Sequence, residues 1–306
     1  MDAIITGLSI GQAALDWLTS GKKGEVLASF SQAVYLRAED DEVYWIIGEK
    51  SPMHNRSLKI SSPFPKMEAG STINVRDGML ELPSGESMDF RQCPAWNPAT
   101  LRRGDAINQE ELGKLANLFF NQLLEQYQPA GMGSLIAGIL RKIERASTAT
   151  EFDNGNIFLK TSWRVVERII PQLQTRDPHQ LSETAMELAG LGEGLTPSGD
   201  DFLGGMIFCL HLLWKTYPET QDNFWNYSAF IEACKTRTNL ISFTFMKEHA
   251  NGHALEPLHK FTNALLEGQP IDTLMQYANE IIHVGHSTGW DMLTGTLVGM
   301  TIIFPG

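Results

Sequence analysis

Residues 190–205 read GLGEGLTPSGDDFLGG, with six glycines in sixteen positions, and they lead directly into the apolar residues 202–214. Thr196 and Ser198 flank Pro197, and this combination is a helix start signal because hydroxyls cap helices and proline fits the first turn. The sequence therefore predicts a glycine-rich loop that enters the N-terminus of a buried central helix. Such a helix start binds phosphate or carboxylate, since free N–H groups and the helix dipole point at the ligand.

A second helix start follows ninety residues later. Residues 288–295, TGWDMLTG, align without a gap with residues 198–205, SGDDFLGG. In both, a hydroxyl residue can cap the amide three residues on while an aspartate reaches back, a capping box with Asp in place of Glu. We expect the two helix starts to converge on one cavity. The alternative is a pair of well-capped core helices whose glycines allow close packing.

Candidate roles follow from these residue types. His286 precedes the second helix start, where an imidazole can titrate near neutrality and act as acid or base. The adjacent Asp200 and Asp201 either stabilise the helix dipole, act in catalysis with Asp291, or hold Mg²⁺ or another divalent cation, although no cofactor is certain. The candidates for anion binding at the two starts are Gly192, Gly194, Thr196, Ser198, Gly199, Ser287, Thr288 and Gly289.

Arg237 is a further candidate for anion binding. It stands among hydroxyl-bearing residues in the segment KTRTNLIS, residues 235–242. A guanidinium can hold a phosphate or carboxylate with two parallel hydrogen bonds. The apolar pattern places this arginine inside one helix spanning residues 227–250.

The chain as a whole predicts an α+β protein. Apolar spacing over residues 2–19 favours a short first helix, and residues 26–90 form short strand patterns separated by Gly and Pro turns, typical of a small antiparallel barrel or sandwich. Prolines in residues 93–98 mark a boundary, after which the pattern is helical. The predicted domains are a β-rich domain at 1–100 and a larger all-helical domain at 101–306.

Charge and composition exclude some partners. The chain has 36 acidic against 24 basic side chains, a formal charge of -12, which argues against binding to nucleic acid. No basic region precedes the first apolar residues, so we expect no secretory signal here. The apolar runs 202–214 and 292–304 are shorter than the roughly 20 residues that span a bilayer, which argues against a membrane. We expect a cytoplasmic protein that binds a small anion locally, through amides and few basic groups.

Four motifs together resemble the AllH family: residues 190–205, RTNLISFTF at 237–245, HANGHALEPL at 249–258 and VGHSTGWDMLTG at 284–295. The resemblance covers residues 95–306 best. It implies a transferase subunit that works with FdrA-like and AllG-like subunits in anaerobic allantoin degradation, where oxalurate and phosphate give oxamate and carbamoyl phosphate. Two alternatives stay open: a stand-alone, metal-assisted hydrolase or transferase acting on a small ureido or carboxylate compound, and a non-catalytic subunit that binds an anion or serves assembly.

Overall fold

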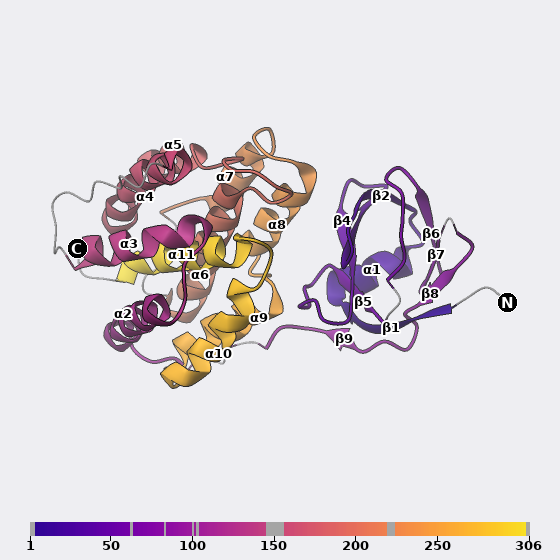
Figure 1. Ribbon diagram of the computed structural model, residues 1–306, viewed down its shortest axis with the longest axis horizontal. Coiled ribbons are helices and arrows are strands. Elements are labelled where there is room, and N and C mark those ends of the chain that lie inside the picture. Colours follow the sequence, from indigo (N-terminus) through magenta and orange to yellow (C-terminus); the bar gives the residue numbers. More distant parts are fainter. Residues whose placement is uncertain are drawn as a thin grey trace. The chain divides into compact units, whose positions relative to one another are not determined.

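The computed structural model describes residues 4–61, 64–82, 84–99, 101, 104–144, 156–218 and 224–303. The chain divides into two compact units, Met1–Ala99 and Thr100–Gly306 (Figure 1). The first unit is built from strands and the second from helices. This arrangement confirms the α+β prediction.

The first unit is a closed β-barrel. Its strands follow the order β5-β4-β3-β2-β6-β7-β8-β1, and pairing of β1 with β5 closes the ring, while β9 pairs with β1 outside it. The strands are β1 (Ile4–Gly11), β2 (Gly24–Ser29), β3 (Ala33–Ala38), β4 (Val43–Ile47), β5 (Ser57–Ile60), β6 (Thr72–Arg76), β7 (Met79–Glu81), β8 (Ser87–Asp89) and β9 (Ala95–Trp96). Closure leaves β1 and β5 paired on both sides, which removes the open sheet edges.

The barrel differs from the prediction in two details. The pairings β1–β8 and β4–β5 are parallel, whereas the other pairings around the ring are antiparallel. Residues 4–11, expected as part of a helix, form β1, and the first helix is α1 (Gln12–Ser20). The strand forms because β5, β8 and β9 all bond to this segment, and no local periodicity reveals those partners. Helix α1 packs into the barrel core, where the Trp17 ring stacks on the Tyr44 ring with the ring centroids 4.6 Å apart.

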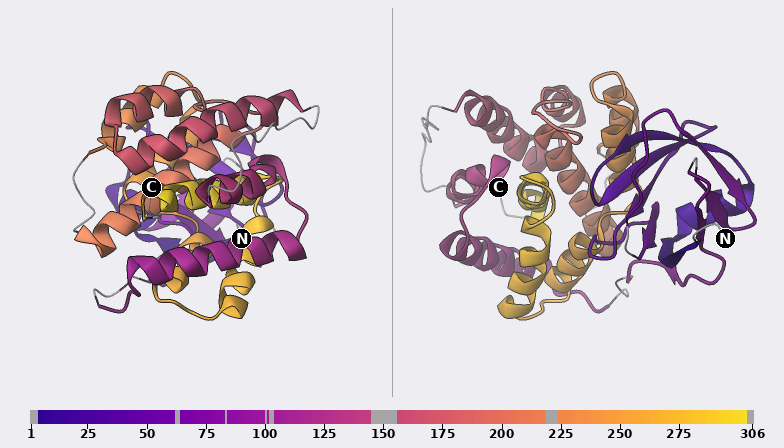
Figure 2. Two further views of the ribbon diagram at one scale, coloured as in Figure 1. Left: turned by 90° about the vertical axis from the view of Figure 1, so that its left-hand side faces the viewer. Right: turned by 45° about the vertical axis from the view of Figure 1, so that its right-hand side comes forward.

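The second unit is helical, and its other helices surround two buried ones, α6 and α11. Helix α11, yellow in Figure 2, runs through the middle of this unit, and every residue from Gly289 to Met300 is buried. The elements are α2 (Gln109–Gln126), η1 (Gly131–Leu135), α3 (Ile136–Ile143), α4 (Ile157–Thr175), α5 (Pro178–Met186), α6 (Ser198–Thr216), α7 (Tyr227–Cys234), α8 (Leu240–Ala250), α9 (Glu256–Leu266), α10 (Ile271–Ile282), α11 (Thr288–Met300) and η3 (Thr301–Ile303).

Glycines let α6 and α11 cross in direct contact. A side chain at Gly205 would collide with the carbonyl oxygen of Met292, and one at Gly295 would collide with that of Phe202. Gly205 and Gly295 occupy equivalent positions in the two aligned motifs, as do Phe202 and Met292. The glycine of each helix therefore packs against the equivalent carbonyl of the other helix.

One predicted helix is wrong. The segment 227–250 breaks into α7 and α8, because Asn239 starts a new helix by accepting a hydrogen bond from the Ser242 N–H at 3.0 Å. Arg237 consequently lies in the turn between the two helices and not within one. Among the described residues, no helix combines the length and the apolar character needed to cross a bilayer.

Candidate functional site

The two helix starts meet, as their aligned sequences predict. Thr196 Oγ1 lies 3.4 Å from Thr288 Oγ1, and Ser198 Oγ lies 3.4 Å from Ser287 Oγ. All four hydroxyl residues are half-buried. Two buried carboxyl groups lie beside them, and we call the six residues the hydroxyl–carboxyl cluster: Thr196, Ser198, Asp201, Ser287, Thr288 and Asp291.

The backbone holds both halves of the cluster in the same way. The Gly199 N–H donates to Leu191 O at 2.8 Å, and the Gly289 N–H donates to Val284 O at 3.1 Å. Gly199 also lies against the carbonyl of Leu188 and Gly289 against that of Ile281, so that no side chain fits at either position. Both glycine N–H groups donate to backbone carbonyls of the protein. Fewer N–H groups are therefore free to bind an anion than the sequence predicts.

The predicted capping boxes do not form. The helices begin at Ser198 and Thr288 themselves, and neither capping residue, Pro197 or Ser287, caps a backbone N–H of its helix with its side chain. A hydroxyl at the first helical position is already past the capping position, so it is free to turn outward. In this structure the hydroxyls turn toward the opposite helix start.

Asp201 is 6% exposed and accepts a hydrogen bond from Thr196 Oγ1 at 3.0 Å. Burial raises the pKa of its carboxyl well above the usual value, and the nearby charge of Asp291 raises it further. The hydroxyls of Thr288 and Thr196 oppose this shift only in part. Burial therefore favours the neutral, protonated form of the Asp201 carboxyl.

Asp291 is fully buried, and its Oδ1 accepts the Met132 N–H at 2.6 Å. Burial raises the pKa of this carboxyl to about 6, against the lowering effect of that N–H, of the Ser287 and Ser198 hydroxyls and of His286. Although these hydroxyls lie near, no described residue makes a well-oriented hydrogen bond to Oδ2. A buried carboxylate oxygen without a partner is costly, which marks Oδ2 as an acceptor available to a ligand or to a proton.

Asp200 faces a different direction from Asp201. Its carboxylate accepts the Gly190 N–H at 2.7 Å, the Ser242 hydroxyl at 2.6 Å and the Thr238 hydroxyl. These bonds tie the glycine-rich loop to the start of α8. Over the described residues, no three His, Cys, Asp or Glu side chains are grouped so that they could hold a metal ion, and a divalent cation at Asp200 and Asp201 stays a prediction.

The remaining predicted site residues are exposed and lie outside the hydroxyl–carboxyl cluster. His286 is exposed, one residue before Ser287, and close enough to Asp291 for its charge to lower that carboxyl's pKa. Gly192 and Gly194 are exposed in the loop with positive φ angles of 117° and 101°. Arg237 is exposed and packs its carbonyl on Gly190. In the described part of the chain, no contact joins its guanidinium to the hydroxyl–carboxyl cluster.

Sequence reasoning missed three contributors to this region. The Met132 N–H that binds Asp291 comes from η1, whose Gly131 has a φ of 51° and leaves no room for a side chain beside Asp291 and Ser287. The only signal was a Gly-Met-Gly sequence at 131–133. Thr238 and Ser242 were recognised as hydroxyls near Arg237, but their partner is Asp200.

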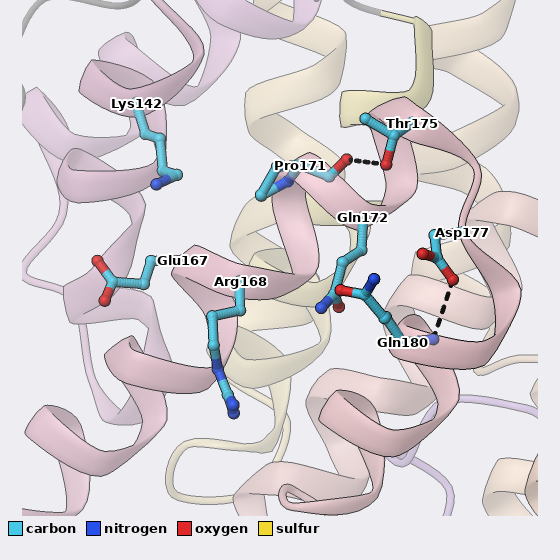
Figure 3. A pocket seen from close by; sticks show the side chains of 8 residues that line it. All are labelled: Lys142, Glu167, Arg168, Pro171, Gln172, Thr175, Asp177 and Gln180. Carbon is cyan, nitrogen blue, oxygen red and sulfur yellow. Dashed lines mark hydrogen bonds between the residues drawn. The ribbon is translucent and has the colours of Figure 1, made fainter.

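A separate pocket of about 580 Å³ lies on α3, α4 and α5 (Figure 3). Arg168 in this pocket forms an ion pair with Glu187 at 2.6 Å, so its charge is already balanced. None of the predicted site residues lines it. The lining residues are Lys142, Glu167, Arg168, Pro171, Gln172, Thr175, Asp177 and Gln180.

Comparison with known proteins finds a family model that matches part of the chain. The family model described as oxamate carbamoyltransferase subunit AllH matches residues 188–300. The matched segment contains both glycine-flanked helix starts and all six residues of the hydroxyl–carboxyl cluster. No solved structure matches the chain.

Proposed function

Because residues 188–300 match the AllH family model, we propose that this chain is a subunit of an oxamate carbamoyltransferase and that the hydroxyl–carboxyl cluster is its substrate site. The reaction moves a carbamoyl group between the nitrogen of oxamate and phosphate. In the degradative direction, oxalurate and phosphate give oxamate and carbamoyl phosphate. The enzyme works in the cytoplasm as a complex with FdrA-like and AllG-like subunits.

One observation carries the proposal. Two aligned motifs from helices ninety residues apart bring four hydroxyls and two buried carboxyls together, and Asp291 Oδ2 lacks a partner among the described residues. Helix packing alone requires the glycines of these motifs. It does not require buried carboxyl groups with raised pKa values, which cluster at functional sites.

The charge state of the cluster suits anionic substrates. Ionised Asp200, Asp201 and Asp291 together would repel phosphate and the oxalyl carboxylate. However, three hydrogen-bond donors surround Asp200, and burial raises the pKa of the Asp201 carboxyl, which favours its neutral form. The hydroxyls are donors for substrate oxygens, and the positive ends of α6 and α11 lie beside them.

The test uses the complex reconstituted with FdrA-like and AllG-like subunits. A double variant, Ser198→Ala with Thr288→Val, removes one hydroxyl from each helix start while keeping the side-chain volume similar. We expect kcat/KM for oxalurate and phosphate to fall by about 100-fold, since each lost donor to a developing charge weakens transition-state binding. Thr175→Val is the matched control, because this exposed hydroxyl bonds only to the Pro171 carbonyl of its own helix.

Three results would contradict the proposal. Full activity of the double variant would place the substrate site elsewhere in the complex. Cleavage of oxalurate by the purified chain alone would remove the need for partner subunits. If the complex binds phosphate but shows no carbamoyl transfer with any subunit combination, the chain is an anion-binding or assembly subunit.

A further inference from the structure

We propose that Asp201 and Asp291 form a proton-sharing pair that both supplies and takes up the proton of the transfer reaction, acting through the four hydroxyls of the cluster. This inference rests on the proposed function and assigns the proton chemistry of that site. In this role the two aspartates are positioning residues, because the hydroxyls lie between them and the substrate.

The geometry places the two carboxyl groups in equivalent positions. Asp201 and Asp291 are each the fourth residue of their helix, and the crossing of α6 and α11 brings the two first turns together. Each carboxyl is approached by a hydroxyl of the opposite helix start, Asp201 by Thr288 and Asp291 by Ser198. A hydroxyl close in sequence also approaches each carboxyl: Thr196 approaches Asp201, and Ser287 approaches Asp291.

Burial separates carboxyls from hydroxyls into two layers. Asp201 and Asp291 are 6% and 0% exposed, whereas the four hydroxyl residues are half-buried. A substrate therefore reaches the hydroxyls first. A proton travels between substrate and carboxyl through one hydroxyl, which donates its own proton and accepts another.

The groups that surround the two carboxyls disfavour a negative charge on both at once. The groups that act on Asp201 are Thr196, Thr288, Asp291 and Asp200, and those on Asp291 are the Met132 N–H, Ser287, Ser198 and His286. No lysine or arginine is among them. Burial raises both pKa values, that of Asp291 to about 6, and the charge of Asp291 raises the pKa of Asp201 further. In this proposal, the proton of the resting pair is assigned to Asp201, which Thr196 and Thr288 approach, and the negative charge to Asp291, whose Oδ1 accepts the Met132 N–H.

The proton balance of the reaction matches this state. Monohydrogen phosphate gives its proton through Ser198 or Ser287 to Asp291 while its oxygen bonds to the carbamoyl carbon. The carbon–nitrogen bond breaks, the electron pair stays on nitrogen, and nitrogen receives a proton from Asp201 through Thr196 or Thr288. Transfer of one proton from Asp291 to Asp201 restores the starting state, so no further reactant is needed.

The unpartnered Oδ2 of Asp291 fits the accepting role. Its other oxygen, Oδ1, is fixed by the Met132 N–H, which orients the carboxyl. A structural carboxylate would have both oxygens bonded, as Asp200 has. Asp200 thus has a structural role, because it binds the glycine-rich loop to α8. Asp291 keeps one oxygen available to accept a proton.

The test measures pH profiles of the reconstituted complex carrying Asp201→Asn or Asp291→Asn. Asparagine keeps the shape, and at position 291 it can still accept the Met132 N–H. We expect kcat to fall by about 100-fold or more in each variant with KM changed by less than about threefold, because proton transfer and not binding is lost. The wild-type rise in activity near pH 6 should be missing in Asp291→Asn.

A readout independent of activity is the infrared carbonyl band of a protonated carboxyl. The wild-type chain should show this band at pH 7, and Asp201→Asn should lack it. Asp272→Asn, which changes an exposed first-turn aspartate of α10, is the matched control and should alter neither the band nor the profile.

Unchanged pH profiles in both variants, or a band that persists in Asp201→Asn, would overturn the proton-sharing pair. The proposed function would still stand if the Ser198→Ala, Thr288→Val variant is impaired. If that variant is also fully active, the substrate site itself is wrongly placed. The two failures are therefore distinguishable.

Discussion

At the scale of single residues, Asp200 and Asp201 show how neighbours in a helix take different roles. Successive helical residues point about 100° apart, so Asp200 faces the glycine loop and α8, whereas Asp201 faces α11. The first is surrounded by three donors, and the second lies in a site where burial raises its pKa and favours the neutral carboxyl.

Replacing Asp200 with alanine should destabilise the helical unit by about 3 kcal/mol. The change leaves the Gly190 N–H and the Thr238 and Ser242 hydroxyls without their acceptor, and the desolvation penalty is largest for the buried Ser242 hydroxyl, since the other two donors are half-buried. Urea denaturation of the purified chain gives the free energy of unfolding, with Asp272→Ala as the control on an exposed aspartate. A loss below about 1 kcal/mol would show that the bonds contribute little.

His249 should make the protein sensitive to acid. Among the described residues, neither of its ring nitrogens has a partner, and burial lowers its pKa from 6.5 to about 4. The unfolded chain therefore binds more protons below pH 6.5, so stability falls as the pH falls and levels off below about pH 4. The loss over that window is about 3 kcal/mol, at about 1.4 kcal/mol per pKa unit.

His249→Leu should flatten this dependence. The measurement is the urea midpoint at several pH values between 7.5 and 4, compared with wild type and with His179→Leu, which changes an exposed histidine. If the variant and the wild type lose stability equally over this window, the acid sensitivity has another source.

At the scale of elements, the contact between α6 and α11 determines the site. Gly205 and Gly295 bring the two backbones into contact, and this places the first turns of both helices beside each other. Equivalent residues make equivalent contacts on both sides, both at the glycines and at the hydroxyls that approach Asp201 and Asp291.

Gly205→Ala and Gly295→Ala should each lower stability by about 2 kcal/mol or more, although alanine favours a helix by about 1 kcal/mol over glycine. The added methyl group would overlap a carbonyl oxygen of the facing helix. Gly299→Ala should have a smaller effect, because its nearest atom, Met206 O, is 2.8 Å from the added carbon. Thermal unfolding followed by circular dichroism measures the series. Stabilisation by Gly205→Ala or Gly295→Ala would refute the close crossing.

At the scale of the whole molecule, the barrel and the helical unit have separate hydrophobic cores. Leu36 is fully buried in the first and Phe208 in the second. The separation means that neither core needs side chains of the other to be filled.

A cavity in one core should therefore loosen only that unit. Leu36→Ala should speed amide hydrogen exchange in β2, β3 and β4 and leave α6 and α11 unchanged, and Phe208→Ala should do the reverse. Each substitution removes buried volume worth about 3 kcal/mol. Mass spectrometry of peptic peptides measures this. Exchange that rises equally in both units would show that they unfold as one domain.

Much of the fold could be predicted from local patterns. The α+β order, the barrel and the two buried helices after glycine-rich starts follow from apolar spacing, turn residues and caps, which act over a few neighbouring residues. The helical prediction failed at residues 4–11 and 235–239. In the first, distant strands supplied hydrogen-bond partners. In the second, a single Asn cap divided a continuous apolar pattern.

The sequence alone determined that two aligned motifs would each open a buried helix with a hydroxyl, a glycine and an aspartate. Only the tertiary structure decided what those side chains do. The hydroxyls face the opposite helix start, and Asp200 accepts a hydrogen bond from the glycine-rich loop. The Met132 N–H donates to Asp291, which is 159 positions away in the chain. The physical reason is that helix starts depend on adjacent residues, whereas the partner of a buried polar group depends on which backbones pack closely enough to reach it.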